Sequence, residues 1–213
     1  MKINLLLAVF ASLLLFASCL GINADIVLNP NGSGTLTLEY RISRSLESLG
    51  RLDGNERWNT IPSGRADLER TLDRLPEMRL LSFSSGEDER NHNISVKMEF
   101  SSIQGLLDFL DPDGSRSSFT GNAQSGRLGF TLIEGREAGN PGLDRLIADI
   151  SRGYSVDISM SFPGQGNLKV TDLQGSPFGA AGQITGQGRR VSGSFPLYDI
   201  LSAENGINLE LSW

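Results

Sequence analysis

The sequence predicts an α+β fold in which short amphipathic helices pack against a largely antiparallel sheet. Two observations support this class. Several segments alternate strictly between apolar and polar residues, most cleanly residues 154–162, which is typical of strands with one buried and one wet face. Between them lie short stretches with apolar residues at helical spacing, such as Ile103, Leu106, Leu107 and Leu110.

Nine segments carry the strand pattern. They are residues 26–28, 35–42, 78–83, 94–100, 128–132, 154–162, 168–170, 191–195 and 207–213. The predicted helices are residues 43–49, 65–75, 101–110, 140–150 and 196–201. Each helix is too short to be stable alone, so we expect each to pack on the sheet.

Turns and loops separate these elements. Residues 29–32 (Asn-Pro-Asn-Gly) predict a hairpin between the first two strands, and residues 111–114 (Asp-Pro-Asp-Gly) predict a turn after a helix. Residues 84–93 form a predicted polar loop, and the glycine-rich residues 175–193 predict a mobile hairpin or loop.

Composition excludes several classes of protein. The chain has 213 residues and a formal net charge of −6, so it has little attraction for the phosphates of a nucleic acid. A single cysteine and a single histidine exclude a disulfide framework, a cysteine-rich metal site and a two-histidine metal motif. We expect no cofactor and no metal.

The N-terminus has the features of an export signal. Residues 5–16 are an unbroken apolar run after Lys2, shorter than the roughly 20 residues that span a bilayer. The run ends in Ala17-Ser18-Cys19, and small residues before a cysteine are typical of a bacterial lipobox. We predict a signal peptide at residues 1–18, lipidation of Cys19, a tether at residues 19–23 and one domain at residues 24–213. An ordinary secretory signal containing Cys19 is the alternative.

Three strand motifs carry a family resemblance. They are residues 32–38 (Gly-Ser-Gly-Thr-Leu-Thr-Leu), 97–102 (Lys-Met-Glu-Phe-Ser-Ser) and 157–164 (Asp-Ile-Ser-Met-Ser-Phe-Pro-Gly). With the order of the predicted elements, they resemble the LppM-like bacterial lipoproteins. The resemblance implies a curved, barrel-like antiparallel sheet and a membrane-tethered envelope protein with a lipid or other hydrophobic ligand. It defines no ligand-binding residues. This chain lacks the C-terminal transmembrane segment of that family, so tethering would depend on Cys19.

Several motifs permit a functional and a structural interpretation. His92 and the acidic residues 87–89 lie in the predicted polar loop, where we expect solvated side chains rather than a catalytic or cation site. Residues 111–115 depart from a calcium loop, which favours an ordinary turn. Arg189 and Arg190 could contact anionic headgroups, although a flexible loop is the preferred interpretation.

The two tryptophans also leave alternatives open. Trp213 ends an alternating strand, as in the last strand of a small outer-membrane β-barrel, but we expect it to pack under a helix. Trp58 covers the core or contacts a ligand or membrane.

These features predict a function class. We expect a non-catalytic lipoprotein of the bacterial cell envelope, exported and held on the membrane through Cys19, with a lipid in an apolar pocket. A structural or protein-interaction lipoprotein is the main alternative, and the small outer-membrane β-barrel is less favoured. The sequence identifies no protein partner.

Overall fold

The computed structural model describes residues 20–43, 64–89, 91–135, 145, 148–149, 151–178 and 183–213. The predicted signal peptide, Cys19, Trp58 and most of the predicted helix at residues 43–49 lie outside the described residues. Of the predicted helix at residues 140–150, Arg145, Ala148 and Asp149 are described, and all three are helical.

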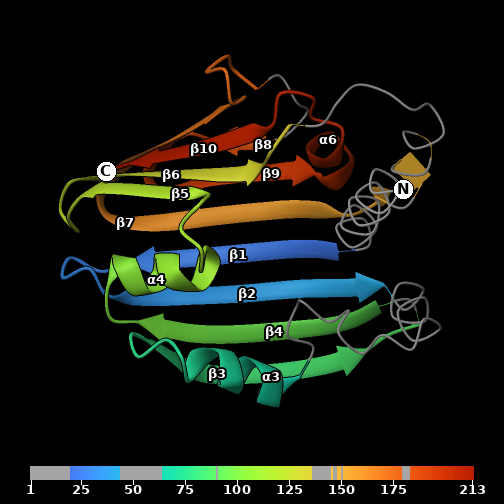
Figure 1. Ribbon diagram of the computed structural model, residues 1–213, viewed down its shortest axis with the longest axis horizontal. Helices are drawn as coiled ribbons and strands as arrows, with labels where there is room; N and C mark the ends of the chain where they lie inside the picture. The colour runs from blue at the N-terminus through green and yellow to red at the C-terminus, as the bar shows by residue number, and fades with distance from the viewer. Residues whose placement is uncertain are drawn as a thin grey trace, which may run out of the picture.

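The described residues form one curved sheet with three short helices (Figure 1). The strands are β1 (Leu20–Leu28), β2 (Gly34–Ser43), β3 (Met78–Glu87), β4 (Asn91–Phe100), β5 (Ser117–Gly121), β6 (Gly126–Ile133), β7 (Ser155–Thr171), β8 (Gln183–Thr185), β9 (Gln187–Pro196) and β10 (Ile207–Ser212). The helices are α3 (Arg65–Leu72), α4 (Ile103–Leu110) and α6 (Leu197–Leu201). The predicted α+β class is therefore confirmed, with strands dominating.

The sheet is open rather than closed. Its strand order is β3-β4-β2-β1-β7-β10-β6-β5, with β9 pairing with β7 and β8 pairing with β9. Within the described residues β3, β5 and β8 each pair with one strand only, so the barrel-like expectation is corrected to an open curved sheet. The antiparallel expectation also fails at one pair, because β1 and β7 run parallel. These two strands lie far apart in the sequence, and a long connection permits parallel pairing.

Strand β7 explains how the sheet bends. Its first half pairs with β1 and β9, and its second half pairs with β10 and, at Gly166 and Asn167, again with β9. The register against β9 shifts between Ser161 and Gly166, where the sequence contains Pro163 and Gly164. The sequence predicted two strands here, because proline and glycine usually end a strand. The strand instead continues through both residues, and its register against β9 shifts there.

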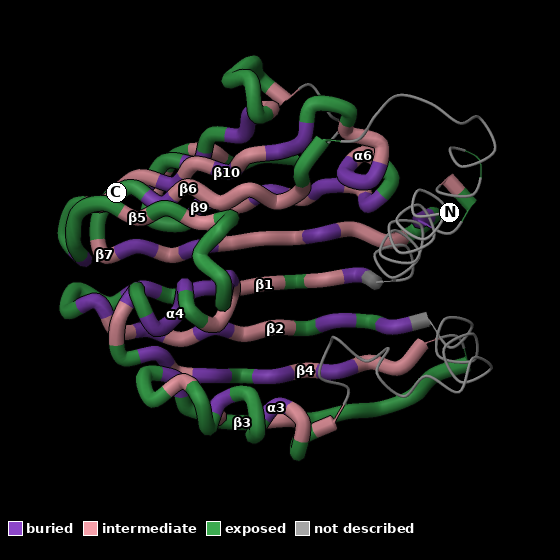
Figure 2. Tube along the Cα trace, viewed as in Figure 1, coloured by how far each residue is buried: buried purple, intermediate pink, exposed green. Residues whose placement is uncertain are grey.

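The core fills one side of the sheet. Figure 2 marks the buried residues along the strands and helices. Alternate residues of β4, from Ile94 to Phe100, are buried on this core face. Helix α4 covers it with Ile103, Leu106 and Leu107, and the Ser102 hydroxyl caps the helix by accepting a hydrogen bond from Gly105 N at 3.1 Å. The buried residues of α3 and α6 join the same core. All three helices therefore lie on the apolar side.

Several predicted loops are strand. The polar loop at residues 84–93 is shorter than expected, because β3 continues to Glu87 and β4 begins at Asn91. Within the glycine-rich stretch, β8 and β9 pair antiparallel, which agrees with the hairpin of the predicted hairpin or loop. Strand β5 was not predicted at all. In each case a neighbouring strand supplies main-chain hydrogen-bond partners, which overrides a weak local preference.

The N-terminal strand also begins early. Residues 20–23, predicted as tether, belong to β1 and pair with residues 39–42 of β2. The predicted hairpin that follows is confirmed: Gly32 N donates to Asn29 O at 3.0 Å, and Gly32 takes a φ of 87°.

Trp213 packs against strands rather than under a helix. Its ring stacks with those of Phe162 and Phe119, with ring centroids 5.2 Å and 6.0 Å away. The indole N–H donates to Ala123 O at 3.1 Å. The expectation of a covering helix was wrong, because Phe119 of β5 and Phe162 of β7 stack on the ring instead.

Candidate functional site

The side of the sheet opposite the helices is polar. Along each strand, the residues that alternate with the core residues line up across the sheet in register. One cross-strand row comprises Gly86, Asn93, Arg41 and Gly21, and we name it the first row. The second row comprises Ser84, Ser95, Glu39, Asn23, Asp157 and Ser194. We call this side of the sheet the polar face.

A hollow lies on the polar face at the first and second rows. It has a volume of about 580 Å³. We name it the trough, and its polar lining side chains include Asn23, Glu39, Arg41, Asn93, Ser95 and Asp157. Five strands contribute to it, β3, β4, β2, β1 and β7. Small residues such as Gly21, Gly86 and Ser84 leave the space that the larger polar side chains border.

Arg41 supplies the positive charge of the trough. Its guanidinium carbon lies 5.8 Å from the centroid of the Tyr154 ring, a cation–π contact. A Cβ atom placed on Gly21 would be 3.1 Å from Arg41 Nη2, so the guanidinium lies directly over this glycine. Within the described part of the chain, Arg41 forms no ion pair.

Two carboxylates of the second row supply the negative charge. Glu39 accepts a hydrogen bond from Asn23 Nδ2 at 3.2 Å. Asp157 accepts from Ser155 Oγ at 2.7 Å and from Ser194 Oγ. These partners are all neutral, so hydrogen bonds fix both carboxylates without compensating their charge.

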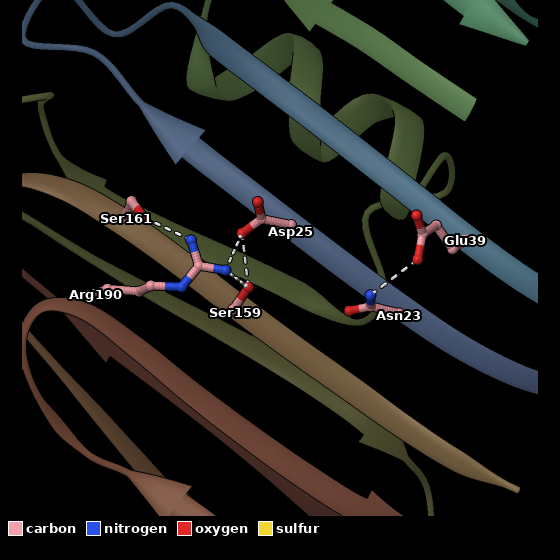
Figure 3. A network of polar contacts seen from close by, with 6 residues as sticks. All are labelled: Asn23, Asp25, Glu39, Ser159, Ser161 and Arg190. Carbon is pink, nitrogen blue, oxygen red and sulfur yellow. Dashed lines mark hydrogen bonds and ion pairs between the residues drawn. The ribbon is translucent and has the colours of Figure 1, made fainter. Parts of the chain in front are cut away.

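Next to the trough, Arg190 joins three strands (Figure 3). Its Nη2 lies 2.9 Å from Asp25 Oδ1 on β1 and 2.8 Å from Ser159 Oγ on β7. Its Nη1 donates to Ser161 Oγ at 3.3 Å. Arg190 is therefore held on the polar face by β1 and β7, where the sequence predicted a flexible loop.

The residues singled out in the sequence do not converge on one site. His92 lies half-buried in β4, in register with Ile42, and lines no part of the trough. The Asp88 carboxylate accepts a hydrogen bond from Asn91 N at 2.7 Å, within the connection between β3 and β4. Among the described residues, no group of three or more potential metal-binding side chains could hold a metal ion. The predicted lipidation site, Cys19, lies outside the described residues, one position before β1.

Asp111 has a structural role. Its Oδ2 accepts hydrogen bonds from Ser117 Oγ at 2.7 Å, Arg116 N at 3.0 Å and Ser117 N at 2.7 Å. The Ser117 hydroxyl bond contributes most to lowering the pKa of Asp111 below its usual value of 3.8, and the two backbone N–H groups add to it. The predicted turn is confirmed by Gly114 N donating to Asp111 O at 3.0 Å.

Sequence analysis missed the charged residues of the trough. Glu39, Arg41 and Asp157 stand at polar positions of alternating strands, where side chains are normally solvated. Only the register, which places these strands side by side, brings the three residues into the same hollow. Their charges at alternating positions place them on the wet face of a strand, but these charges do not identify which strands are neighbours.

Comparisons with known proteins add one structural likeness. No family model matches the chain, and no curated protein matches its sequence. The chain is similar to the NMR structure of the folded domain of the Mycobacterium tuberculosis LppM protein, with a TM-score of 0.43 and 12% sequence identity. The match covers 90% of this chain and 88% of that one. A likeness at this score carries no argument about ligand, activity or membrane attachment.

None of the described helices is both long enough and apolar enough to cross a membrane.

Proposed function

We propose that this chain is a non-catalytic lipoprotein of the bacterial cell envelope, anchored through Cys19, that binds the polar part of a ligand in the trough. The observation that carries the proposal is the position of the trough. It lies on the polar face, whereas the opposite side of the sheet is occupied by the packed core.

The N-terminal sequence supports export and anchoring. The apolar residues 5–16 and the small residues before Cys19 are typical of a lipoprotein signal. Two or three acyl chains on one cysteine give stable membrane attachment without a transmembrane helix.

The lining of the trough supports a polar ligand. Amide, hydroxyl, carboxylate and guanidinium groups border it, and each can form a hydrogen bond with a polar partner. Ile22, Tyr40 and Ile94 add apolar surface to the lining. A ligand seated here would therefore present its polar part to the protein, whether or not it carries an acyl chain.

The arrangement also supports a role in binding rather than catalysis. Neutral groups hold Asp157 and Glu39, and the single histidine of the chain lies outside the trough. The trough offers hydrogen-bonding groups spread across five strands, as a binding surface does.

One observation favours the alternative of a protein-interaction lipoprotein. Leu81 is 43% exposed on β3, a strand at one end of the described sheet. An end strand with an exposed apolar side chain can pair with a strand of another protein.

Two measurements test the proposal. The first compares the full chain with its Cys19→Ala variant by cell fractionation: the wild type should be recovered with membranes and the variant should be released. Recovery of both proteins with membranes would show that Cys19 is not the anchor.

The second measurement is native mass spectrometry of the purified lipoprotein after incubation with envelope extract. The wild type should retain a ligand mass that an Arg41→Gln, Glu39→Gln variant loses. Lys97→Gln changes an exposed charge on β4 outside the trough lining, so this control variant should keep the ligand. Retention by all three proteins would place the ligand outside the trough.

A further inference from the structure

We infer that the trough binds a zwitterionic headgroup with a primary ammonium, of the phosphoethanolamine type, in the membrane that holds the anchor. In this arrangement Arg41 binds the phosphate, and Glu39 and Asp157 bind the ammonium. The inference rests on the proposed function, because it requires the anchor at Cys19 and a ligand in the trough.

The position of the anchor places the trough at the membrane surface. Strand β1 begins at Leu20, so the chain enters the sheet immediately after Cys19. A strand residue spans about 3.3 Å, which puts Gly21 within roughly 7 Å of the lipidated residue and Asn23 within roughly 13 Å. Both residues line the trough. The headgroups around the anchor are therefore within its reach.

The charges have the same order as those of a zwitterionic headgroup. Arg41 belongs to the first row, which contains Gly21 and lies nearer the anchor. Glu39 and Asp157 belong to the second row, about 7 Å farther along the strands. In a phosphoethanolamine lipid the phosphate is attached at the glycerol, and the ammonium lies farther from the membrane across a two-carbon linker. Arg41 would therefore face the phosphate, and Glu39 and Asp157 would face the ammonium.

The state of each charged group also fits. Within the described residues, Arg41 has no anionic partner, and its contact with the Tyr154 ring leaves N–H groups for a phosphate. Glu39 and Asp157 have only neutral partners there. A primary ammonium has three N–H donors and would give the two carboxylates the opposite charge that they lack.

The net charge argues against an anionic headgroup. Two carboxylates and one guanidinium give the trough a formal charge of −1. This charge repels a headgroup that carries a negative phosphate and no positive group. A headgroup that carries both charges meets no such penalty.

The test uses the full lipoprotein reconstituted in phosphatidylcholine vesicles that carry phosphatidylethanolamine, phosphatidylglycerol or neither. Hydrogen exchange of backbone amides at residues 20–23 and 39–41 is measured in each. Intact mass first confirms that Cys19 carries acyl chains. We expect phosphatidylethanolamine to slow exchange about tenfold relative to phosphatidylcholine alone, the effect of roughly one charge-assisted hydrogen bond.

Three variants assign the contacts. Arg41→Gln and the double variant Glu39→Gln, Asp157→Asn should each lose the protection, whereas Lys97→Gln should keep it. Protection that survives both trough variants overturns the inference.

The three vesicle compositions distinguish failure of the headgroup assignment from failure of the proposed function. The headgroup assignment is overturned, and the proposed function stands, if vesicles with phosphatidylglycerol slow exchange as much as vesicles with phosphatidylethanolamine, or more. The same holds if vesicles of phosphatidylcholine alone slow exchange as much as those with phosphatidylethanolamine, compared with protein without lipid. No protection of the trough by any lipid, in protein confirmed to be acylated, overturns the inference. Free O-phosphoethanolamine added to the Cys19→Ala protein should bind far more weakly than the vesicle lipid. Equal binding would show that the membrane is not the source.

Discussion

Phe162 lies where the register of β7 against β9 shifts, and its removal gives the sharpest prediction of stability. Phe162 is 5% exposed and stacks on Trp213. Its ring also covers Gly166 at the other end of the register shift, since a Cβ atom there would come 2.2 Å from Phe162 Cδ2. Replacing a buried phenylalanine with alanine costs about 3–5 kcal/mol, which includes the cavity left behind.

We therefore expect Phe162→Ala to lower the free energy of unfolding by about 3–5 kcal/mol. For a chain of this length each kcal/mol corresponds to about 2–4 °C in Tm, so Tm should fall by roughly 6–20 °C. Urea unfolding followed by circular dichroism measures the free energy, and thermal unfolding measures Tm.

A matched control and a milder variant keep this prediction testable. Ile184→Ala removes an apolar side chain that is 43% exposed on β8, and should change stability by about 0.5 kcal/mol or less. If Phe162→Ala does not fold, Phe162→Leu should fold with a smaller loss. A loss below about 1 kcal/mol for Phe162→Ala would show that the aromatic stack contributes little to the stability of the fold.

Three further predictions concern other parts of the fold. Leu106 on α4 is 1% exposed, so Leu106→Ala should lower the free energy of unfolding by about 3–5 kcal/mol, measured by urea unfolding. Gly34→Ala should destabilise the β1–β2 hairpin strongly, because its Cβ would come 2.0 Å from Val27 O and 2.3 Å from Phe100 Cζ; a lower Tm checks it. The lowered pKa of Asp111 stabilises the fold above the ordinary value of 3.8, and this contribution is lost as pH falls through the folded-state pKa. Asp111→Asn should therefore show less loss of stability than the wild type between about pH 5 and 2 in urea titrations, and an unchanged slope would contradict this.

Local patterns in the sequence predicted much of the fold. Strict alternation at residues 94–100 and 207–213 predicted β4 and β10, because each strand buries one face. The apolar spacing from Ile103 to Leu110 predicted α4. The parallel pairing of β1 with β7 could not be predicted in this way. It depends on contacts between distant parts of the chain that leave no local pattern.

The candidate site was less predictable than the fold. Arg41 and Glu39 alternate with Tyr40 and Ile42 as on any strand with one wet face. Only the register shows that Glu39 and Asp157 share a row across β1. Long-range pairing, rather than local propensity, creates the trough.

The central claim is that the ligand is bound on the polar face and not within the core. Its most direct test is backbone amide NMR of the purified lipoprotein titrated with envelope extract. We predict that shifts concentrate at Asn23, Glu39, Arg41 and Asp157, while Ile103 and Leu106 of α4 remain unchanged. Shifts centred on α4 and the core residues beneath it, with the trough unaffected, would contradict the account and indicate a ligand enclosed in the apolar interior.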